Sequence, residues 1–140
     1  MPDTQVSTGR VATAPVAEGL FTTDPPQLLG ACCRACGRLS FPATSRWCPY
    51  CRADAPEVRP LPTTGTVYSY TIVRVPVPGY TGPTPYGLGL VELAGIRVAS
   101  TLVADPLESL SVGATVRFCL LDVGTPEDPL LSYGYRLERP

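Results

Sequence analysis

The stretch LLGACCRACGRLSFPATSRWCPYC, residues 28–51, contains five of the six cysteines of the chain. Cys33 and Cys36 form one C-x-x-C pair, and Cys48 and Cys51 form a second. A two-residue gap lets a tight turn point both thiolates at one ion, and two such turns complete a tetrahedron. The 11 residues between the pairs suffice for a β-hairpin. We therefore expect a ribbon-like metal site with these four cysteines as its ligands.

Four thiolates with no open coordination position are typical of structural zinc, because catalytic zinc keeps a position for water or substrate. The prediction is one structural zinc ion. Iron held by the same four cysteines, or two disulfides, are the alternatives. Clustered pairs in a chain without a signal peptide favour a metal in a reducing compartment. A redox role for either pair is disfavoured, because no thioredoxin-like βαβ pattern surrounds them.

Two cysteines remain outside this set. Using Cys32 in place of Cys33 would widen the first pair to C-x-x-x-C, so Cys32 is predicted to be unliganded. Cys119 is far from the cluster in sequence and lies in an apolar stretch, where a free cysteine commonly serves as a small hydrophobic side chain.

The regions that flank the cluster differ in composition. Residues 1–25 show no period of 3.6 or 2 and are predicted to be a disordered tail. Prolines follow the cluster and resist helix and central strand alike, so that segment is predicted to be a linker. They are Pro56, Pro60 and Pro62. The predicted division is a tail (1–25), a zinc ribbon with its Pro-rich linker (26–60) and a barrel (61–140).

The last 80 residues predict β-strands, because five segments are rich in Val, Ile, Tyr, Thr or Leu and most are bounded by Gly or Pro. These segments are residues 65–75, 86–93, 95–103, 114–123 and 130–138.

Between the third and fourth segments, Asp105 is predicted to cap a short helical turn, with Pro106 at its first position and Glu108 completing a capping box. This element order is that of an OB-type barrel, a small Greek-key barrel. A small β-sandwich is the alternative within the same mainly β class.

Alternation along two of these segments supports a barrel with a buried inner face. Arg97 and Arg117 are expected to point away from the apolar positions beside them. Those apolar positions are Ile96, Val98 and Leu102 in one strand and Val116, Phe118 and Leu120 in the other.

Charge and residue usage exclude several functions. The net charge is −1 with a pI near 5.3, so no strong field favours a phosphate backbone, and no nucleic-acid partner is expected. The sequence contains no histidine and no lysine, which are common in acid–base and nucleophilic catalysis, so an independent enzyme is not expected. No stretch approaches the 18 or so apolar residues of a membrane span. A soluble, cytoplasmic protein is the expectation.

Two segments are candidates for contacts with a partner. Residues 28–60 carry five arginines against Asp54 and Glu57, a local net charge of +3, and include Arg34 and Arg38. The Pro-rich segment 75–87 carries Tyr80 and Tyr86, and aromatic side chains on stiff loops are suited to binding. A solvated surface and a cover for the barrel mouth are the simpler interpretations of these two segments.

The ordered combination of these segments resembles one protein family, the acyl-CoA-associated rubredoxin-like zinc ribbons fused to OB folds. The resemblance covers about residues 27–120 and rests on LLGACCRACGRLSFP, WCPYC, GTVYSYTIVRVP, PYGLGLVEL, GIRVASTLV and LSVGATVRF. It implies that Cys33, Cys36, Cys48 and Cys51 are the metal ligands. Cys32 stands at a position that is usually not cysteine in such proteins.

The resemblance also implies a function. Family members look non-catalytic: they dock on a thiolase-like acyltransferase or aldolase, support its fold and help to shape the entrance for the CoA substrate. On this interpretation Arg34, Arg38, Tyr80 and Tyr86 are candidate contacts with the partner or with CoA. The alternatives are a stand-alone nucleic-acid-binding ribbon and barrel, and a module that binds acyl-CoA or an acyl carrier without an obligate enzyme partner.

Overall fold

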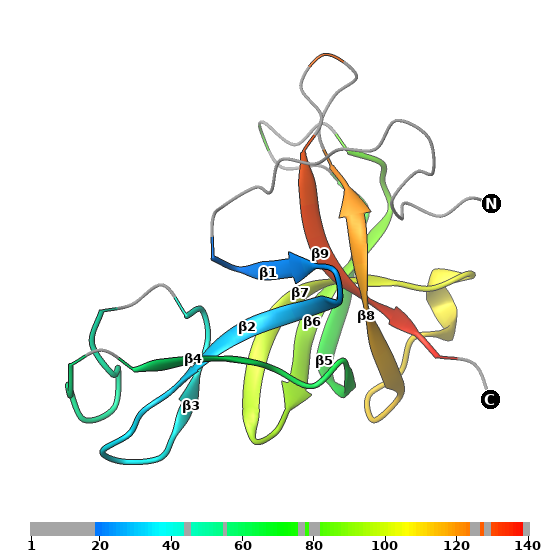
Figure 1. The fold of residues 1–140 in the computed structure, drawn as a ribbon. Helices are drawn as coiled ribbons and strands as arrows, with labels where there is room; N and C mark the ends of the chain where they lie inside the picture. The colour runs from blue at the N-terminus through cyan, green and yellow to red at the C-terminus, as the bar shows by residue number, and fades with distance from the viewer. Residues whose placement is uncertain are drawn as a thin grey trace.

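A computed structural model of the chain describes residues 19–43, 46–54, 56–75, 78, 82–123, 127 and 130–138. A small ribbon projects from one side of a β-barrel (Figure 1). Within the described residues, no helix is long and apolar enough to cross a membrane. Most of the predicted disordered tail, residues 1–18, lies outside the described residues.

The ribbon is organised around one strand. The strands are β1 (Phe21–Thr23), β2 (Pro26–Cys32), β3 (Leu39–Ser40) and β4 (Glu57–Pro60), and β2 pairs antiparallel with each of the other three. Strand β1 falls at the end of the segment predicted to be a tail. Strand β4 falls in the predicted linker and pairs only with β2 among the described strands. It is therefore an edge strand, a position that tolerates proline.

The second unit is a closed five-stranded barrel. Its strands are β5 (Thr64–Val73), β6 (Tyr86–Leu93), β7 (Ile96–Val103), β8 (Thr115–Asp122) and β9 (Leu131–Leu137). They close in the order β5-β6-β7-β9-β8, with β8 pairing back onto β5. All pairs are antiparallel except β7 with β9. This topology confirms the predicted OB-type barrel over the sandwich, and each of its five strands lies within two residues of its predicted bounds.

The alternation in β7 and β8 is as predicted. Val98, Leu102, Val116 and Phe118 are buried, and the two arginines beside them are exposed. Ile96 and Leu120 are partly buried and pack against the same core.

The short helical turn is present, but its predicted cap is wrong. The turn is a 3₁₀-helix over Leu107–Ser109, and its N-cap is Pro106, with no side-chain cap hydrogen bond. Proline has no side-chain acceptor, so a capping box cannot form from this position. Instead Ser109 donates to the Pro106 carbonyl oxygen through its backbone N–H at 3.0 Å and through its hydroxyl at 2.6 Å.

Ribbon and barrel share one hydrophobic core. Phe21 and Leu28 of the ribbon, together with Leu61, join the barrel residues in a single cluster. The Leu61 N–H donates to the Leu28 carbonyl oxygen at 2.8 Å. Gly30 permits this close approach, because a Cβ there would lie 2.7 Å from a Leu61 methyl carbon. The rings of Phe21 and Phe41 also pack on Tyr133 of β9, with centroids 6.3 and 5.9 Å away.

This shared core predicts that ribbon and barrel unfold together. Leu28 is fully buried, so Leu28→Ala is expected to lower the free energy of unfolding by about 2–5 kcal/mol. The control Val58→Ala removes a side chain that is 53% exposed in β4 and is expected to change it by about 0.5 kcal/mol or less. Denaturant unfolding, followed by both tryptophan fluorescence and far-UV circular dichroism, measures both variants. Two separate transitions, with the barrel transition unchanged by Leu28→Ala, would contradict the shared core.

Candidate metal centre

The first knuckle follows directly from β2. After the strand ends at Cys32, the chain turns back, with the Gly37 N–H donating to the Cys33 carbonyl oxygen at 2.9 Å and the Cys33 N–H donating to that of Arg38 at 3.0 Å. Gly37 has φ +76°, in the left-handed region that glycine adopts without steric cost. The turn therefore places Cys33 and Cys36 on its inner side.

The second knuckle repeats this geometry. The Arg52 N–H donates to the Cys48 carbonyl oxygen at 2.9 Å, and the Cys48 N–H donates to that of Ala53 at 2.8 Å. Arg52 occupies the position that corresponds to Gly37 and has φ +67°. The knuckle is closed by a β-bridge between Trp47 and Asp54.

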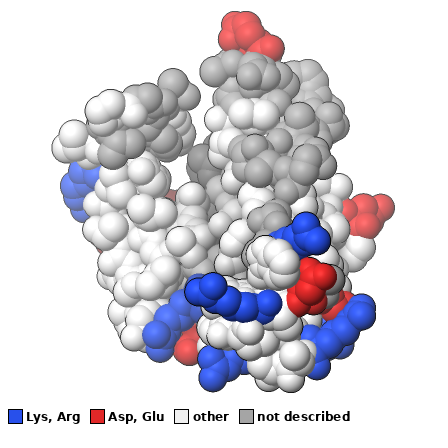
Figure 2. Space-filling model, turned by 90° about the vertical axis from the view of Figure 1, so that its left-hand side faces the viewer, with Lys and Arg blue, Asp and Glu red and all other residues white. Residues whose placement is uncertain are grey.

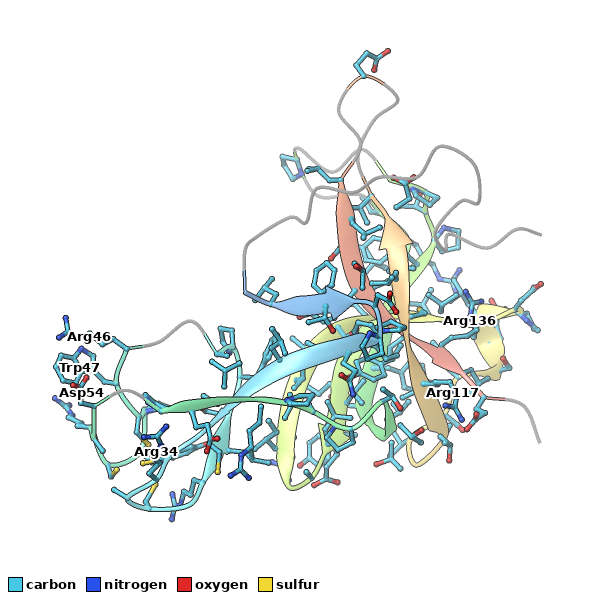
Figure 3. The ribbon with its side chains drawn as sticks, in the orientation of Figure 1. Arg34, Arg46, Trp47, Asp54, Arg117 and Arg136 are labelled. Carbon is cyan, nitrogen blue, oxygen red and sulfur yellow. The ribbon has the colours of Figure 1, made fainter. Side chains whose placement is uncertain are left out.

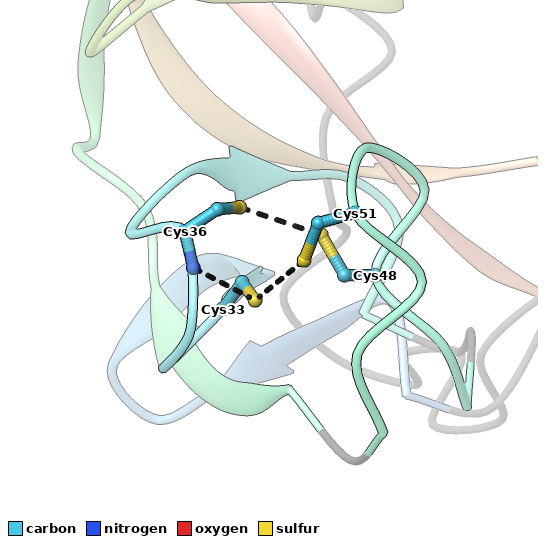
Figure 4. A group of neighbouring side chains, drawn as sticks. All are labelled: Cys33, Cys36, Cys48 and Cys51. Atoms are coloured by element: carbon cyan, nitrogen blue, oxygen red, sulfur yellow. Dashed lines mark hydrogen bonds between the residues drawn. The ribbon is translucent and has the colours of Figure 1, made fainter.

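The two knuckles bring four sulfur atoms together (Figure 4). The Sγ atoms of Cys33, Cys36, Cys48 and Cys51 all lie within 4.8 Å of one another. Two of the distances are 3.5 Å, between Cys33 and Cys51, and 3.7 Å, between Cys36 and Cys48. Four sulfurs bound to a zinc ion at about 2.3 Å would lie about 3.8 Å apart. The cluster thus matches the donor type, number and spacing of a tetrahedral zinc site.

Backbone amides direct negative charge to the buried member of each knuckle. The N–H groups of Cys36 and Ala35 donate to Cys33 Sγ at 3.4 and 3.3 Å, and they lower the pKa of Cys33 to about 6, with the Cys36 amide the larger cause. In the second knuckle the amides of Cys51 and Tyr50 lower the pKa of Cys48 in the same way. Thiolates are the metal-binding form of cysteine. These amides therefore prepare the site for a cation.

Cys51 shows the opposite shift. The Ala53 amide acts to lower its pKa, but the contact with Cys33 Sγ and burial outweigh this and raise it to about 11. A thiol must lose its proton to bind a metal ion, so metal binding at Cys51 would release a proton.

The remaining cysteines lie outside this group. Cys32 is the last residue of β2, where it pairs with Leu39 and Glu57, and neighbouring strand residues point to opposite faces. Cys119 is in β8 and pairs with Gly134 in the barrel. Neither belongs to the four-sulfur group.

The predicted contact residues are not brought together. Arg34 and Arg38 lie in the first knuckle at the ribbon end, where Figure 3 labels Arg34. Tyr86 begins β6, whereas Arg38 lines a crevice beside the turn that follows β6. Strand β6, eight residues or about 25 Å long when extended, runs between Tyr86 and this turn. Tyr80 lies outside the described residues.

The structure also adds two residues that sequence reasoning missed. Trp47 and Tyr50 of the second knuckle are half exposed, and an arginine lies over each ring: Arg46 over Trp47 at 5.1 Å and Arg38 over Tyr50 at 5.0 Å. The signal in the sequence was the motif WCPYC, in which one aromatic residue precedes each cysteine. The knuckle is too small to bury either aromatic ring.

A four-cysteine ribbon on an OB-type barrel defines a class of zinc-ribbon and OB-fold proteins, and comparison with known proteins agrees. Residues 24–57 match the family described as "ChsH2, rubredoxin-like zinc ribbon domain", and residues 58–120 match "ChsH2, C-terminal OB-fold domain". The chain belongs to this ChsH2-type family, whose relatives also carry the name DUF35.

Two curated relatives cover most of the chain. The benzoylsuccinyl-CoA thiolase subunit BbsA of Thauera aromatica is 35% identical over 117 residues, which is 79% of this chain and 76% of BbsA. A DUF35 domain-containing scaffold protein of Methanocaldococcus jannaschii is 29% identical over 115 residues, or 79% of this chain and 80% of the relative.

Solved structures show the same architecture. A chain of the Ltp2-ChsH2(DUF35) aldolase superposes with a TM-score of 0.62 at 29% identity, covering 79% of this chain and 84% of that one. A DUF35-family protein of unknown function from Sulfolobus solfataricus superposes with a TM-score of 0.56 at 21% identity, covering 86% and 80%. The second likeness is one of fold alone.

The geometry of the cluster predicts which cysteines retain metal. Cys48→Ser removes a buried sulfur of the group and is expected to lower the metal content at least about tenfold and to lower the free energy of unfolding, because binding at such sites is largely folding energy. Cys32→Ser is the matched control, one residue from Cys33, and should keep the metal content of the wild type. Elemental analysis of the purified proteins measures both. Equal loss from Cys32→Ser and Cys48→Ser would contradict this ligand set.

Proposed function

We propose that this chain is a non-catalytic accessory subunit that docks on a thiolase-like acyltransferase or aldolase acting on acyl-CoA thioesters. The observation that carries the proposal is the similarity to BbsA, a subunit of benzoylsuccinyl-CoA thiolase, because it spans ribbon and barrel at 35% identity. The likeness to a chain of the Ltp2-ChsH2(DUF35) aldolase supports a partner from the same enzyme group. The chain would support the fold of this partner and help to form its CoA-substrate entrance.

The side chains available support an accessory role. The sequence has no histidine and no lysine, and four of its six cysteines are committed to the ribbon cluster. Acyl transfer and carbon–carbon bond cleavage need a nucleophile or an acid–base pair within hydrogen-bond reach. On this proposal the partner enzyme supplies both.

The same proposal assigns one structural zinc ion to Cys33, Cys36, Cys48 and Cys51. The donor set is all sulfur, which suits zinc, and four sulfurs would fill all positions of a tetrahedral ion and leave none for substrate. The ion would hold the two knuckles of the ribbon together and take no part in chemistry. Two of the sulfurs are exposed, and burial in a complex would protect them from oxidation.

Arg34 and Arg38 on the ribbon, Tyr86 at the start of β6, and Tyr80 in the Pro-rich segment before it in the sequence are proposed contacts with the partner or with CoA. Tyr86 begins β6, whereas Arg38 lies beside the turn that follows β6. The two arginines and the two tyrosines would therefore serve different contacts. A single surface that spans both would require a partner that covers the length of the barrel.

The direct test is co-purification with a thiolase-like enzyme. The wild-type chain, co-expressed with a thiolase-like enzyme subunit from the same source, is expected to co-elute with that enzyme in gel filtration. The double variant Arg34→Gln/Arg38→Gln and the variant Tyr86→Ala are each expected to weaken either the complex or the use of the CoA substrate, with metal content unchanged. A lost complex assigns the residue to the protein interface, whereas an intact complex with a raised KM assigns it to the CoA entrance.

Two results would contradict the proposal. One is the absence of any complex at micromolar concentration, together with tight, strongly salt-dependent binding of single-stranded nucleic acid, which would favour the rival function. The other is turnover of an acyl-CoA by the chain alone.

A further inference from the structure

A crevice of about 470 Å³ lies where the ribbon meets the barrel. The ribbon contributes Gly37, Arg38 and Leu39 from its first knuckle and Tyr50 from its second. The barrel contributes the β6–β7 turn, residues 94–96. This volume falls within the range of sites that bind small ligands or protruding side chains. The crevice exists only because the two units are packed against each other.

One side of the crevice is formed by Arg38, which lies over the aromatic ring of Tyr50. The Arg38 guanidinium carbon lies 5.0 Å from the centroid of the Tyr50 ring. A stacked guanidinium keeps the N–H groups at its edge available for a carboxylate or phosphate. Among the residues that the structure describes, Arg38 forms no ion pair. Tyr50 is 49% exposed, so its ring also lacks full cover.

Each wall belongs to a tight turn. Gly37, with φ +76°, shapes the first knuckle, and the β6–β7 turn uses Ala94 at φ +47° and Gly95 at φ +88°. Turns of this kind fix the two strands that they join in one register. The crevice is therefore already formed before a partner binds, which reduces the entropic cost of docking.

The charge around the crevice favours an anionic occupant. The other arginines of the two knuckles are Arg34, Arg46 and Arg52, and within the described part of residues 28–54 the only acidic side chain is Asp54, paired with Arg46 at 3.6 Å. Figure 2 looks at the ribbon end and shows arginines over the lower part of this face, with acidic side chains among them. Arginines beside a thiolate-rich group also balance its negative charge. The test therefore measures docking and metal retention separately.

We propose that this crevice is the docking site for an acidic segment of the partner enzyme. An Asp or Glu carboxylate of that segment pairs with the Arg38 guanidinium, and an adjacent apolar or aromatic side chain packs on Tyr50, Leu39 and Ile96. A polypeptide fits better than a free anion, because the lining combines one cation with apolar side chains and an exposed ring. Trp, Tyr and Arg are the residues that most often dominate binding energy at protein interfaces. The inference rests on the proposed function, since it places the contact with that enzyme.

The barrel offers a matched control for the cation–aromatic pair. Arg97 lies over the ring of Tyr68 at 3.8 Å, and Tyr68 is 44% exposed. This pair has the same chemistry and similar exposure but does not line the crevice. Substituting it changes the net charge by the same amount as substituting Arg38 and Tyr50, and it changes the exposed aromatic surface by a similar amount.

The experiment measures the dissociation constant of the complex by biolayer interferometry at low and high salt, with metal content determined for every variant. Arg38→Gln and Tyr50→Ala are each expected to raise Kd about tenfold or more with metal retained. Arg97→Gln and Tyr68→Ala are expected to change it less than about twofold. Arg38→Gln should also flatten the salt dependence, because one charge pair is removed. A photo-crosslinking p-benzoylphenylalanine at position 50, but not at position 68, should capture a partner peptide that contains Asp or Glu.

The outcomes separate this inference from the proposed function. A complex that forms normally with Arg38→Gln and Tyr50→Ala overturns the docking site and leaves the proposed function intact. Equal weakening by the crevice pair and the control pair also overturns it. No complex with the wild-type chain overturns both proposals. Binding of a fluorescent single-stranded oligonucleotide that is lost with Tyr50→Ala, in place of enzyme binding, would identify the crevice as a nucleic-acid site.

Discussion

Strand β2 is fixed at both ends, and this constraint connects the two halves of the molecule. Leu28, near its start, is fully buried in the hydrophobic cluster of the barrel, and Cys33, directly after its end, is a member of the four-sulfur group. Five residues of extended chain span about 17 Å. The four-sulfur group is therefore held at a set distance and direction from the barrel. Leu61 and the rings that pack on Tyr133 prevent the ribbon from rotating about this strand.

The knuckles add little apolar surface of their own. The segment between the cysteine pairs is short and none of its described residues is fully buried, so a ribbon of this size depends on a metal or on its neighbour for stability. Here the barrel provides one means of support, and the four-sulfur group would provide the other by binding a metal ion. The result is a rigid projection whose turns carry arginine and aromatic side chains in fixed positions. Such a surface is suited to binding another protein, and it needs no catalytic group of its own.

Local patterns in the sequence predicted most of this arrangement. The four cysteines could be assigned because both C-x-x-C pairs are set by short-range geometry, and the barrel strands could be placed because alternation is also local. Strand β1 was missed because Phe21–Thr23 is only three residues long and is stabilised by pairing with β2. The capping box failed at Pro106. The crevice could not be predicted, because it joins residues 37–39, 50 and 94–96, which are adjacent only after the ribbon packs on the barrel.

As we propose above, the chain completes an enzyme without reacting itself. Titration of the purified chain into the purified partner enzyme, with turnover of an acyl-CoA thioester as the readout, tests this most directly. We expect the chain alone to be inactive, and the activity of the enzyme to rise with added chain until a fixed stoichiometric ratio is reached. Full activity of the enzyme without the chain, at the same substrate concentration and with the same thermal stability as the complex, would contradict this proposal.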